Sequence, residues 1–264
     1  MTDATTDRPV AFVTGAGRGI GAATARRLAA DGFRVACVDI GDDDAALPYS
    51  LSTVAELEAV ASDIGGLAFV ADVRDQTALD AAAAAVVDTW GGIDVVVAAA
   101  GIMSGGEVGW KMPDEQWNVN IDVNLSGVWR TAKATIPHLL HQPTPRRGRF
   151  IAIASAAGMQ GHPTISAYVA AKHGVIGLVR SLAVELGTTG ITANCVCPGS
   201  TDSGILRASA AVYALESVDE FATHHPIGRI LQPEEIAAAV SWLAAAEQSG
   251  VTGISLPVDG GMTI

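Results

Sequence analysis

The sequence predicts a single α/β domain built on a seven-stranded, doubly wound parallel sheet with helices on both faces. Three observations lead to this fold class. Short runs rich in β-branched residues recur along the chain, alanine-rich helical segments separate them, and a glycine-rich turn directly follows the first run. Because most runs are apolar without strict alternation, they are typical of strands buried on both faces. The expected strands cover residues 10–13, 34–38, 67–71, 94–97, 149–154, 191–196 and 254–258.

The alternation of strands and helices predicts right-handed crossovers between parallel strands. The loops that follow the strands then share the carboxyl edge of the sheet, where ligands bind in this architecture. No linker divides the chain, so residues 10–264 are expected to form one domain after a flexible tail at residues 1–9. The alanine-rich stretch at residues 81–87 is interpreted as a tightly packed helix, since alanine is the best helix former.

Composition and charge exclude several classes of protein. Hydrophobic residues make up 49% of the 264 residues and charged residues 17%, which is enough apolar material for a large core. The formal net charge of -12 would repel a phosphate backbone, so nucleic acid is not an expected partner. The first nine residues lack an apolar signal region, and no apolar run approaches the roughly 18 residues that span a bilayer. We therefore expect a cytoplasmic protein without a membrane partner.

The cysteines predict neither a disulfide framework nor a metal centre. Cys37, Cys195 and Cys197 all fall inside apolar runs, and no histidine cluster accompanies the Cys-x-Cys pair. We expect three buried thiols and no metal.

A glycine-rich turn, Thr14-Gly15-Ala16-Gly17-Arg18-Gly19-Ile20-Gly21, joins the first strand to a helical run at residues 22–30. Glycines let the backbone approach a pyrophosphate, and the amino terminus of the helix supplies free N–H groups and a favourable dipole. A glycine-rich turn alone is weak evidence, but its place between a first strand and a first helix predicts a dinucleotide site. The expected contacts from this turn are Gly15, Gly17, Arg18, Gly19 and Ile20.

Asp39 follows the second strand about 20 residues after the glycines, where a carboxylate can accept hydrogen bonds from both adenine-ribose hydroxyls. It would repel a 2′-phosphate, so NAD is favoured over NADP. Arg18 is the counter-evidence, because its guanidinium could receive such a phosphate. The acidic run at residues 42–44 adds to the repulsion. Asp72 and Val73, after the third strand, are placed to meet the adenine.

Three side chains suggest proton chemistry at a substrate oxygen. Tyr168 and Lys172 are four residues apart and share one face of a helix, while Ser155 ends the fifth expected strand. Removing a hydride from an alcohol needs a base for the hydroxyl proton, and tyrosine, with a pKa of about 10, is a poor one near neutrality. A nearby ammonium, together with a positive nicotinamide ring, favours tyrosinate, and the Ser155 hydroxyl can hold the substrate oxygen in line.

With this spacing, Ser-x12-Tyr-x3-Lys, the chain resembles the classical short-chain dehydrogenase/reductase family over nearly its whole length. Residues 14–21 match that family's glycine motif, Asn124 its catalytic asparagine, Pro198-Gly199 its turn after the sixth strand and residues 259–261 a terminal motif. The resemblance implies a Rossmann fold and a homotetramer. It also implies that Asn124 holds a water that links Lys172 to solvent, and that Lys172 bonds the nicotinamide ribose.

The same resemblance assigns further cofactor contacts. The segment from Gly199 to Ser203 would surround the nicotinamide amide, with Ser203 where the family usually has threonine. The run from Ala98 to Gly101 lacks the asparagine that normally braces the central strand beside the cofactor, which leaves that bracing unassigned. The contacts expected on these grounds are Ala99, Ala100, Gly101, Tyr168, Lys172, Pro198, Gly199, Thr201 and Ser203.

The loop after Asp39, with Leu47-Pro48-Tyr49 leading to residues 53–57, looks like the insertion of the mycofactocin-associated and carveol-dehydrogenase-like branch of the family. In that branch the insertion closes over NAD, which then exchanges slowly, and an external redox carrier performs the re-oxidation. The alternative interpretation is an ordinary acidic surface loop.

The substrate side is predicted from the loops after the fourth, fifth and sixth strands. The candidates are Met103, Trp110, Ser155, Met159, Gln160, His162, Tyr168 and the segment 204–221. That segment is expected to belong to a helical lid at about residues 200–225. His162 is interpreted as a loop residue rather than an acid or a metal ligand. A modest apolar pocket favours a small secondary alcohol or its ketone. The alternatives are an NADPH-dependent 3-oxoacyl-carrier reductase and a non-catalytic nucleotide-sensing protein.

Overall fold

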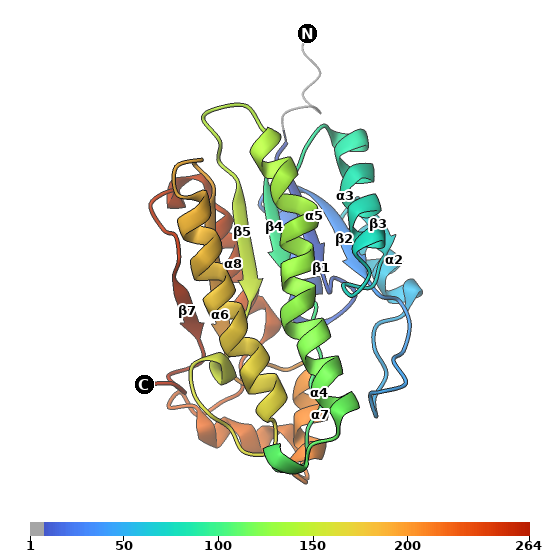
Figure 1. Cartoon of the computed structure of the whole chain (residues 1–264), viewed down its shortest axis with the longest axis vertical. Coiled ribbons are helices and arrows are strands. Elements are labelled where there is room, and N and C mark those ends of the chain that lie inside the picture. The colour runs from blue at the N-terminus through green and yellow to red at the C-terminus, as the bar shows by residue number, and fades with distance from the viewer. Residues whose placement is uncertain (1–7) are drawn as a thin grey trace.

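The computed structural model describes residues 8–264 and contains one seven-stranded sheet in the order β3-β2-β1-β4-β5-β6-β7 (Figure 1). Every neighbouring pair of strands is parallel. The predicted doubly wound sheet is therefore confirmed, and each observed strand overlaps its predicted range. The strands are β1 (Val10–Thr14), β2 (Arg34–Asp39), β3 (Leu67–Val70), β4 (Val95–Ala98), β5 (Arg149–Ile153), β6 (Thr192–Pro198) and β7 (Ser255–Val258).

Helices cover both faces of the sheet and bury two separate apolar clusters. One cluster packs α3, α5 and α6 against one face, and the other packs α1, α2 and α8 against the opposite face. The predicted alanine-rich helix lies within α3. The helices are α1 (Gly19–Ala30), α2 (Val54–Asp63), α3 (Gln76–Trp90), α4 (Asp114–Ile121), α5 (Gly127–His141), α6 (Ser166–Leu186), α7 (Gly204–Val212) and α8 (Pro233–Ala244).

The last two residues of the expected amino-terminal tail are bonded to the rest of the domain. Of the expected tail, residues 1–7 lie outside the described part of the chain. Arg8 donates side-chain hydrogen bonds to the carbonyls of Gly32 and Phe33, each at 2.9 Å, and the Pro9 carbonyl accepts from the Arg34 backbone nitrogen. Arg8 and Pro9 are thus bound to the start of β2.

Helix α6 combines length with an apolar composition. Its 21 residues are long and apolar enough, by length and composition, to cross a membrane. Its inner face packs against the sheet, with Val175, Val179 and Ala183 in the core cluster beside α5. The apolar character of α6 is therefore accounted for by core packing.

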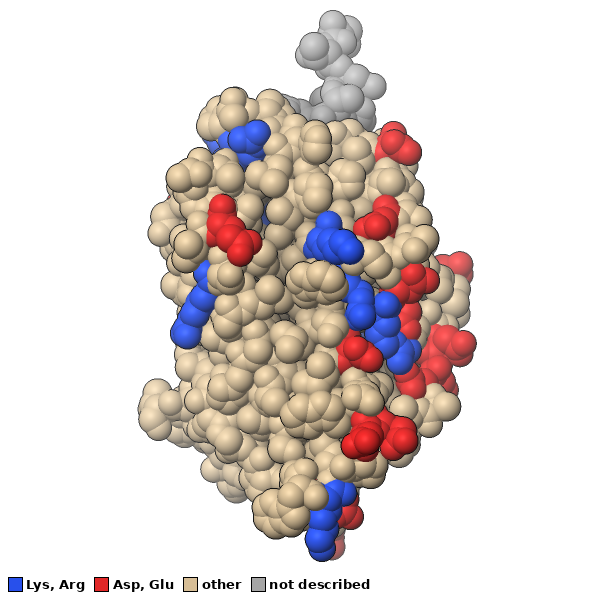
Figure 2. Space-filling model, viewed as in Figure 1, with Lys and Arg blue, Asp and Glu red and all other residues tan. Residues whose placement is uncertain are grey.

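Acidic side chains gather on the side of the molecule where α2, α3 and the loop between β2 and α2 lie in Figure 1, as Figure 2 shows. This distribution places much of the excess negative charge beside the carboxyl end of β2. The three cysteines are buried, as expected.

Candidate active site

A cavity of about 1060 Å³ lies at the carboxyl edge of the sheet. The glycine-rich turn and the ends of β2 and β3 line one part of it, and the loop after β5 and the lid line another. The crossovers bring these segments together because each strand runs in the same direction. The cavity is large enough for a dinucleotide and a small second molecule.

The glycine-rich turn has the backbone that a phosphate site requires. Gly15 has a φ of 68°, and a Cβ there would lie 2.7 Å from the backbone nitrogen and Cα of Ala100. Gly19, with a φ of 54°, begins α1, whose first turn receives no side-chain cap from Arg18. The first N–H groups of α1 are therefore available to an anion, and these residues fit a pyrophosphate.

Asp39 lines the cavity at the end of β2, and both of its carboxylate oxygens accept hydrogen bonds from backbone nitrogens. Its Oδ2 accepts from the Gly17 nitrogen and its Oδ1 from the Ile40 nitrogen, each at 2.8 Å. Arg18 also lines the cavity, where it donates to the Ser50 carbonyl at 2.8 Å and lies 3.8 Å from the Glu56 carboxylate. The guanidinium offered as counter-evidence to NAD thus bonds the inserted loop through one of its nitrogens.

The inserted loop, residues 41–53, is called the strap below. Arg74 lies between two acidic residues, with N–O distances of 2.6 Å to Asp44 of the strap and 2.6 Å to Asp72 after β3. These carboxylates raise the pKa of Arg74. At the other end, Tyr49 Oη accepts a 2.9 Å hydrogen bond from the Met103 backbone nitrogen. The strap is therefore bonded at two points to segments that line the cavity.

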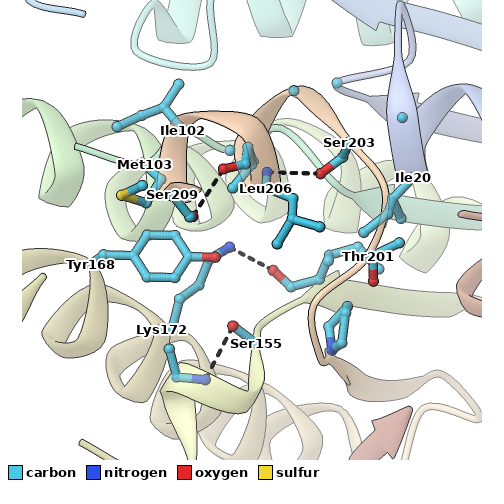
Figure 3. Close-up of a pocket in the computed structure, with 18 of the residues that line it drawn as sticks. Ile20, Ile102, Met103, Ser155, Tyr168, Lys172, Thr201, Ser203, Leu206 and Ser209 are labelled. Carbon is cyan, nitrogen blue, oxygen red and sulfur yellow. Dashed lines mark hydrogen bonds between the residues drawn. The ribbon is translucent and has the colours of Figure 1, made fainter. Parts of the chain in front are cut away.

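Ser155, Tyr168 and Lys172 meet in the cavity, as predicted, and Figure 3 shows them side by side. Ser155 ends β5, and its hydroxyl accepts from the Ala157 nitrogen at 3.1 Å. Lys172 donates to the Ile153 carbonyl at 2.9 Å, and its Nζ lies 5.6 Å from the centroid of the Tyr168 ring. Tyr168 and Lys172 are both buried.

Burial shifts the pKa values of two members of this group. Burial raises the pKa of Tyr168, and the Ser155 hydroxyl only partly opposes that effect. Burial also lowers the pKa of Lys172 to about 8. In the protein chain by itself, desolvation therefore disfavours tyrosinate, and the expected stabilisation of tyrosinate combines Lys172 with a positive nicotinamide ring.

Asn124 lies in a π-helical turn, Asp122–Ser126, and is buried behind the cavity wall rather than lining it. Its Oδ1 accepts from the Ile102 nitrogen at 3.1 Å and its Nδ2 donates to the Ile102 carbonyl at 3.0 Å. A Cβ on Gly101 would lie 3.1 Å from Asn124 Oδ1 and 3.7 Å from Lys172 Nζ. Asn124 is thus near Lys172, across Gly101.

Thr14 supplies the bracing that the sequence left unassigned. Its hydroxyl accepts from the backbone nitrogens of Ala99 and Ala100, at 3.2 and 3.3 Å. The strand end beside the cofactor site is therefore fixed from β1.

Most of the predicted contacts line the cavity, and four do not. Met159 and Trp110, which the sequence assigned to the substrate side, are 40% and 85% exposed and lie outside the lining. Gly17 and Asn124 lie just behind the lining. The predicted residues that line the cavity are Gly15, Arg18, Gly19, Ile20, Asp39, Asp72, Val73, Ala99, Ala100, Gly101, Met103, Ser155, Gln160, His162, Tyr168, Lys172, Pro198, Gly199, Thr201 and Ser203, with Ile205, Leu206, Ser209, Tyr213, Leu215, Glu220 and Phe221 from the lid.

His225 is a site residue that the sequence reasoning missed. It is 3% exposed, its Nε2 accepts from the Ser200 nitrogen at 3.1 Å and its Nδ1 donates to the Arg229 carbonyl. A Cβ on Gly199 would lie 2.8 Å from that Nε2. His225 therefore supports the turn after β6 from the end of the lid, and no motif in the sequence marked it.

The fold and the site define a dinucleotide-dependent oxidoreductase. A family model described as enoyl-(acyl carrier protein) reductase matches residues 15–263. An uncharacterized oxidoreductase of Mycobacterium tuberculosis is 42% identical, over 99% of this chain and 98% of its own, and (-)-trans-carveol dehydrogenase of Rhodococcus erythropolis is 36% identical, over 97% of each. The crystal structure of carveol dehydrogenase from Mycobacterium avium in complex with NAD superposes with a TM-score of 0.91 at 35% identity, covering 98% of this chain and 99% of that one. The chain belongs to the short-chain dehydrogenase/reductase family.

Proposed function

We propose that this protein interconverts a small secondary alcohol and its ketone with NAD as the redox partner. The observation that carries the proposal is that Ser155 and the buried Tyr168 and Lys172 lie in one cavity with the glycine-rich turn. Relatives named as carveol dehydrogenases, one of them solved with NAD, support the same reaction class.

The chemistry divides between the protein and its cofactor. When bound, NAD⁺ supplies the acceptor for the hydride and its two electrons. Tyr168 takes the hydroxyl proton as the C–O bond becomes a carbonyl, and it returns that proton in the reduction direction. Ser155 holds the substrate oxygen in line, and the ammonium of Lys172 favours the tyrosinate. Asn124 holds a water that links Lys172 to solvent.

Asp39 supports NAD over NADP, because its carboxylate is held at the end of β2 and would repel a 2′-phosphate. The contacts of Arg18 with Ser50 and Glu56 engage part of the guanidinium that could otherwise receive that phosphate. The residues that would hold NAD are the cavity-lining members of the predicted set, with Asp72 and Val73 at the adenine.

The strap supports slow exchange of NAD. It lines the cavity with Asp44, Tyr49 and the run 50–52, and it is bonded to the protein at Arg74 and at Met103. A cofactor beneath it leaves only after these contacts break. Slow exchange in turn calls for an external redox carrier that re-oxidises the cofactor in place, as in the mycofactocin-associated branch.

We further propose that the protein is a homotetramer in the cytoplasm. Trp117 on α4 and Trp129 on α5 are 43% and 47% exposed, which is consistent with an interface between copies on these two helices. Light scattering on the purified protein measures the assembly.

A 3-oxoacyl-carrier reductase remains the second candidate, because a putative ketoacyl reductase of Streptomyces coelicolor is 36% identical over 98% of each chain. Asp39 argues against the NADPH that such a reductase would use.

Mass spectrometry of the cofactor released from the purified protein, followed by an alcohol panel with NAD or an artificial electron acceptor, tests the proposal. We expect NAD and turnover of secondary alcohols. Release of NADP with reduction of 3-oxoacyl thioesters would favour the second candidate.

A further inference from the structure

The part of the cavity lined by Met103, by the loop at residues 155–165 and by the lid at 203–224 is called the substrate compartment here. Its walls around Tyr168 are apolar. Met103, Ala157 and Ile165 form a buried cluster with Tyr168, and Ile205 of α7 packs against that cluster. These walls suit a hydrocarbon frame held against the tyrosine hydroxyl.

No lysine or arginine among residues 8–264 lines the substrate compartment apart from Lys172, which is bonded to the Ile153 carbonyl behind Tyr168. The acidic residue there is Glu220, whose Oε1 already accepts from the nitrogens of Glu216 and Ser217. A carboxylate or phosphate placed near Glu220 would meet a like charge and no lysine or arginine side chain of its own to pair with. The compartment therefore favours an uncharged substrate.

Gln160 and His162 place two hydrogen-bonding side chains in the lining of this compartment. The Gln160 amide nitrogen lies 3.4 Å from His162 Nε2. Burial and the neighbouring His224 lower the pKa of His162, so its ring is neutral at pH 7. With the amide donating to Nε2, the ring proton lies on Nδ1.

This arrangement leaves one acceptor and one donor without a further protein partner among residues 8–264: Gln160 Oε1 and the Nδ1–H of His162. A hydroxyl can donate to the first and accept from the second, whereas a keto oxygen can use only the second. The pair is thus suited to an oxygen on the ligand.

The loop that carries the pair is held in place. The Gln160 nitrogen donates to the Ala156 carbonyl at 3.2 Å, and Tyr213 at the end of α7 donates its hydroxyl to the Pro163 carbonyl at 3.0 Å. Thr164 has a φ of 62°, a left-handed conformation that is strained for a β-branched residue. A loop fixed in this way loses little freedom when a ligand binds.

We propose that Gln160 and His162 form a hydroxyl-binding subsite, and that the substrate is a compact, neutral alcohol with a second hydroxyl or keto oxygen on its hydrocarbon frame. The inference rests on the proposed function, because Tyr168 acts on the first oxygen of the same molecule.

The test compares cyclohexanol with 1,2-, 1,3- and 1,4-cyclohexanediol and with 4-hydroxycyclohexanecarboxylate, using NAD or an artificial acceptor. We expect at least one diol to exceed cyclohexanol in kcat/KM by about 3- to 10-fold, the effect of one or two neutral hydrogen bonds. The carboxylate should be the poorest substrate. Gln160→Leu and His162→Phe should each lower the ratio of kcat/KM for the preferred diol to kcat/KM for cyclohexanol by about 3- to 10-fold, so that the diol preference is lost.

Met159→Leu is the matched control, because Met159 neighbours the pair but lies outside the cavity lining. It should keep the diol preference. The inference is overturned if cyclohexanol is oxidised and no diol is preferred, or if both subsite variants keep the preference.

If the wild-type protein oxidises none of these alcohols, that result would instead count against the proposed function. In that case we measure the shift in Tm that each diol and cyclohexanol cause in the NAD-bound protein. A larger shift with a diol than with cyclohexanol would support the subsite. Equal shifts would overturn it.

Discussion

The phenol oxygen of Tyr49 accepts a hydrogen bond of 2.9 Å from the backbone nitrogen of Met103. This bond joins the loop between β2 and α2 to the loop after β4, and both segments line the same cavity. It gives the strap a fixed position at the end opposite its ion pair with Arg74.

Tyr49→Phe should speed NAD release by about 2- to 10-fold, because it removes the acceptor for one backbone N–H. Stopped-flow release of NADH into excess NAD measures the rate. Asp42→Asn, a change elsewhere in the strap, is the control and should leave the rate unchanged. A Tyr49→Phe rate equal to wild type would show that the strap does not hold the cofactor.

Asp39→Ala should raise the ratio of kcat/KM for NADP to that for NAD by at least about 10-fold. The substitution removes a charged acceptor for the ribose hydroxyls and a source of repulsion toward a 2′-phosphate. Asp39→Asn, which can still accept from Gly17, should show an intermediate ratio and controls for the glycine-rich turn. An unchanged ratio in both variants would mean that another residue selects the cofactor.

The fold was predictable from the sequence because its signals are local. Apolar runs with β-branched residues mark strands, and the glycines at 15 and 19 mark a turn whose backbone few other residues adopt. The group of Ser155, Tyr168 and Lys172 was predictable because two of its members share a helix face. These features depend on neighbours in the chain.

The remaining contacts join segments far apart in the chain. Tyr49 and Met103 are 54 residues apart, and Thr14 braces a strand end 85 residues away. The outward position of Met159 depends on the short helical turn at Ala156–Gly158, which the sequence did not mark. The raised pKa of Tyr168 depends on burial, a tertiary property.

His225→Phe should raise KM for NAD by about 3- to 10-fold with a smaller change in kcat. The substitution removes the acceptor for the Ser200 nitrogen and loosens the turn after β6. His225→Gln, whose Oε1 can accept the same bond, should restore KM toward wild type. If KM for NAD rises equally in His225→Phe and His225→Gln, the lost hydrogen bond is not the cause of the rise.

Lys172→Met isolates the effect of a buried ammonium on stability. The pKa of Lys172 falls from 10.5 to about 8 in the folded protein, so the unfolded chain holds more protons than the folded one between these values. Raising the pH from 7 to 10 should therefore stabilise wild type relative to the variant, by up to about 3 kcal/mol. Urea unfolding of both proteins at each pH gives the free energy of unfolding of wild type minus that of the variant. A value that stays constant or falls as the pH rises would contradict the burial effect.

The proton transfer by Tyr168 is the central claim, and Tyr168→Phe tests it most directly. The substitution keeps the ring in its buried cluster and removes the hydroxyl alone. In parallel measurements of NAD affinity and of kcat on a secondary alcohol, we predict an affinity within about 3-fold of wild type and a kcat lower by about 10²- to 10⁴-fold. A kcat near wild type in a variant that binds NAD normally would contradict the account.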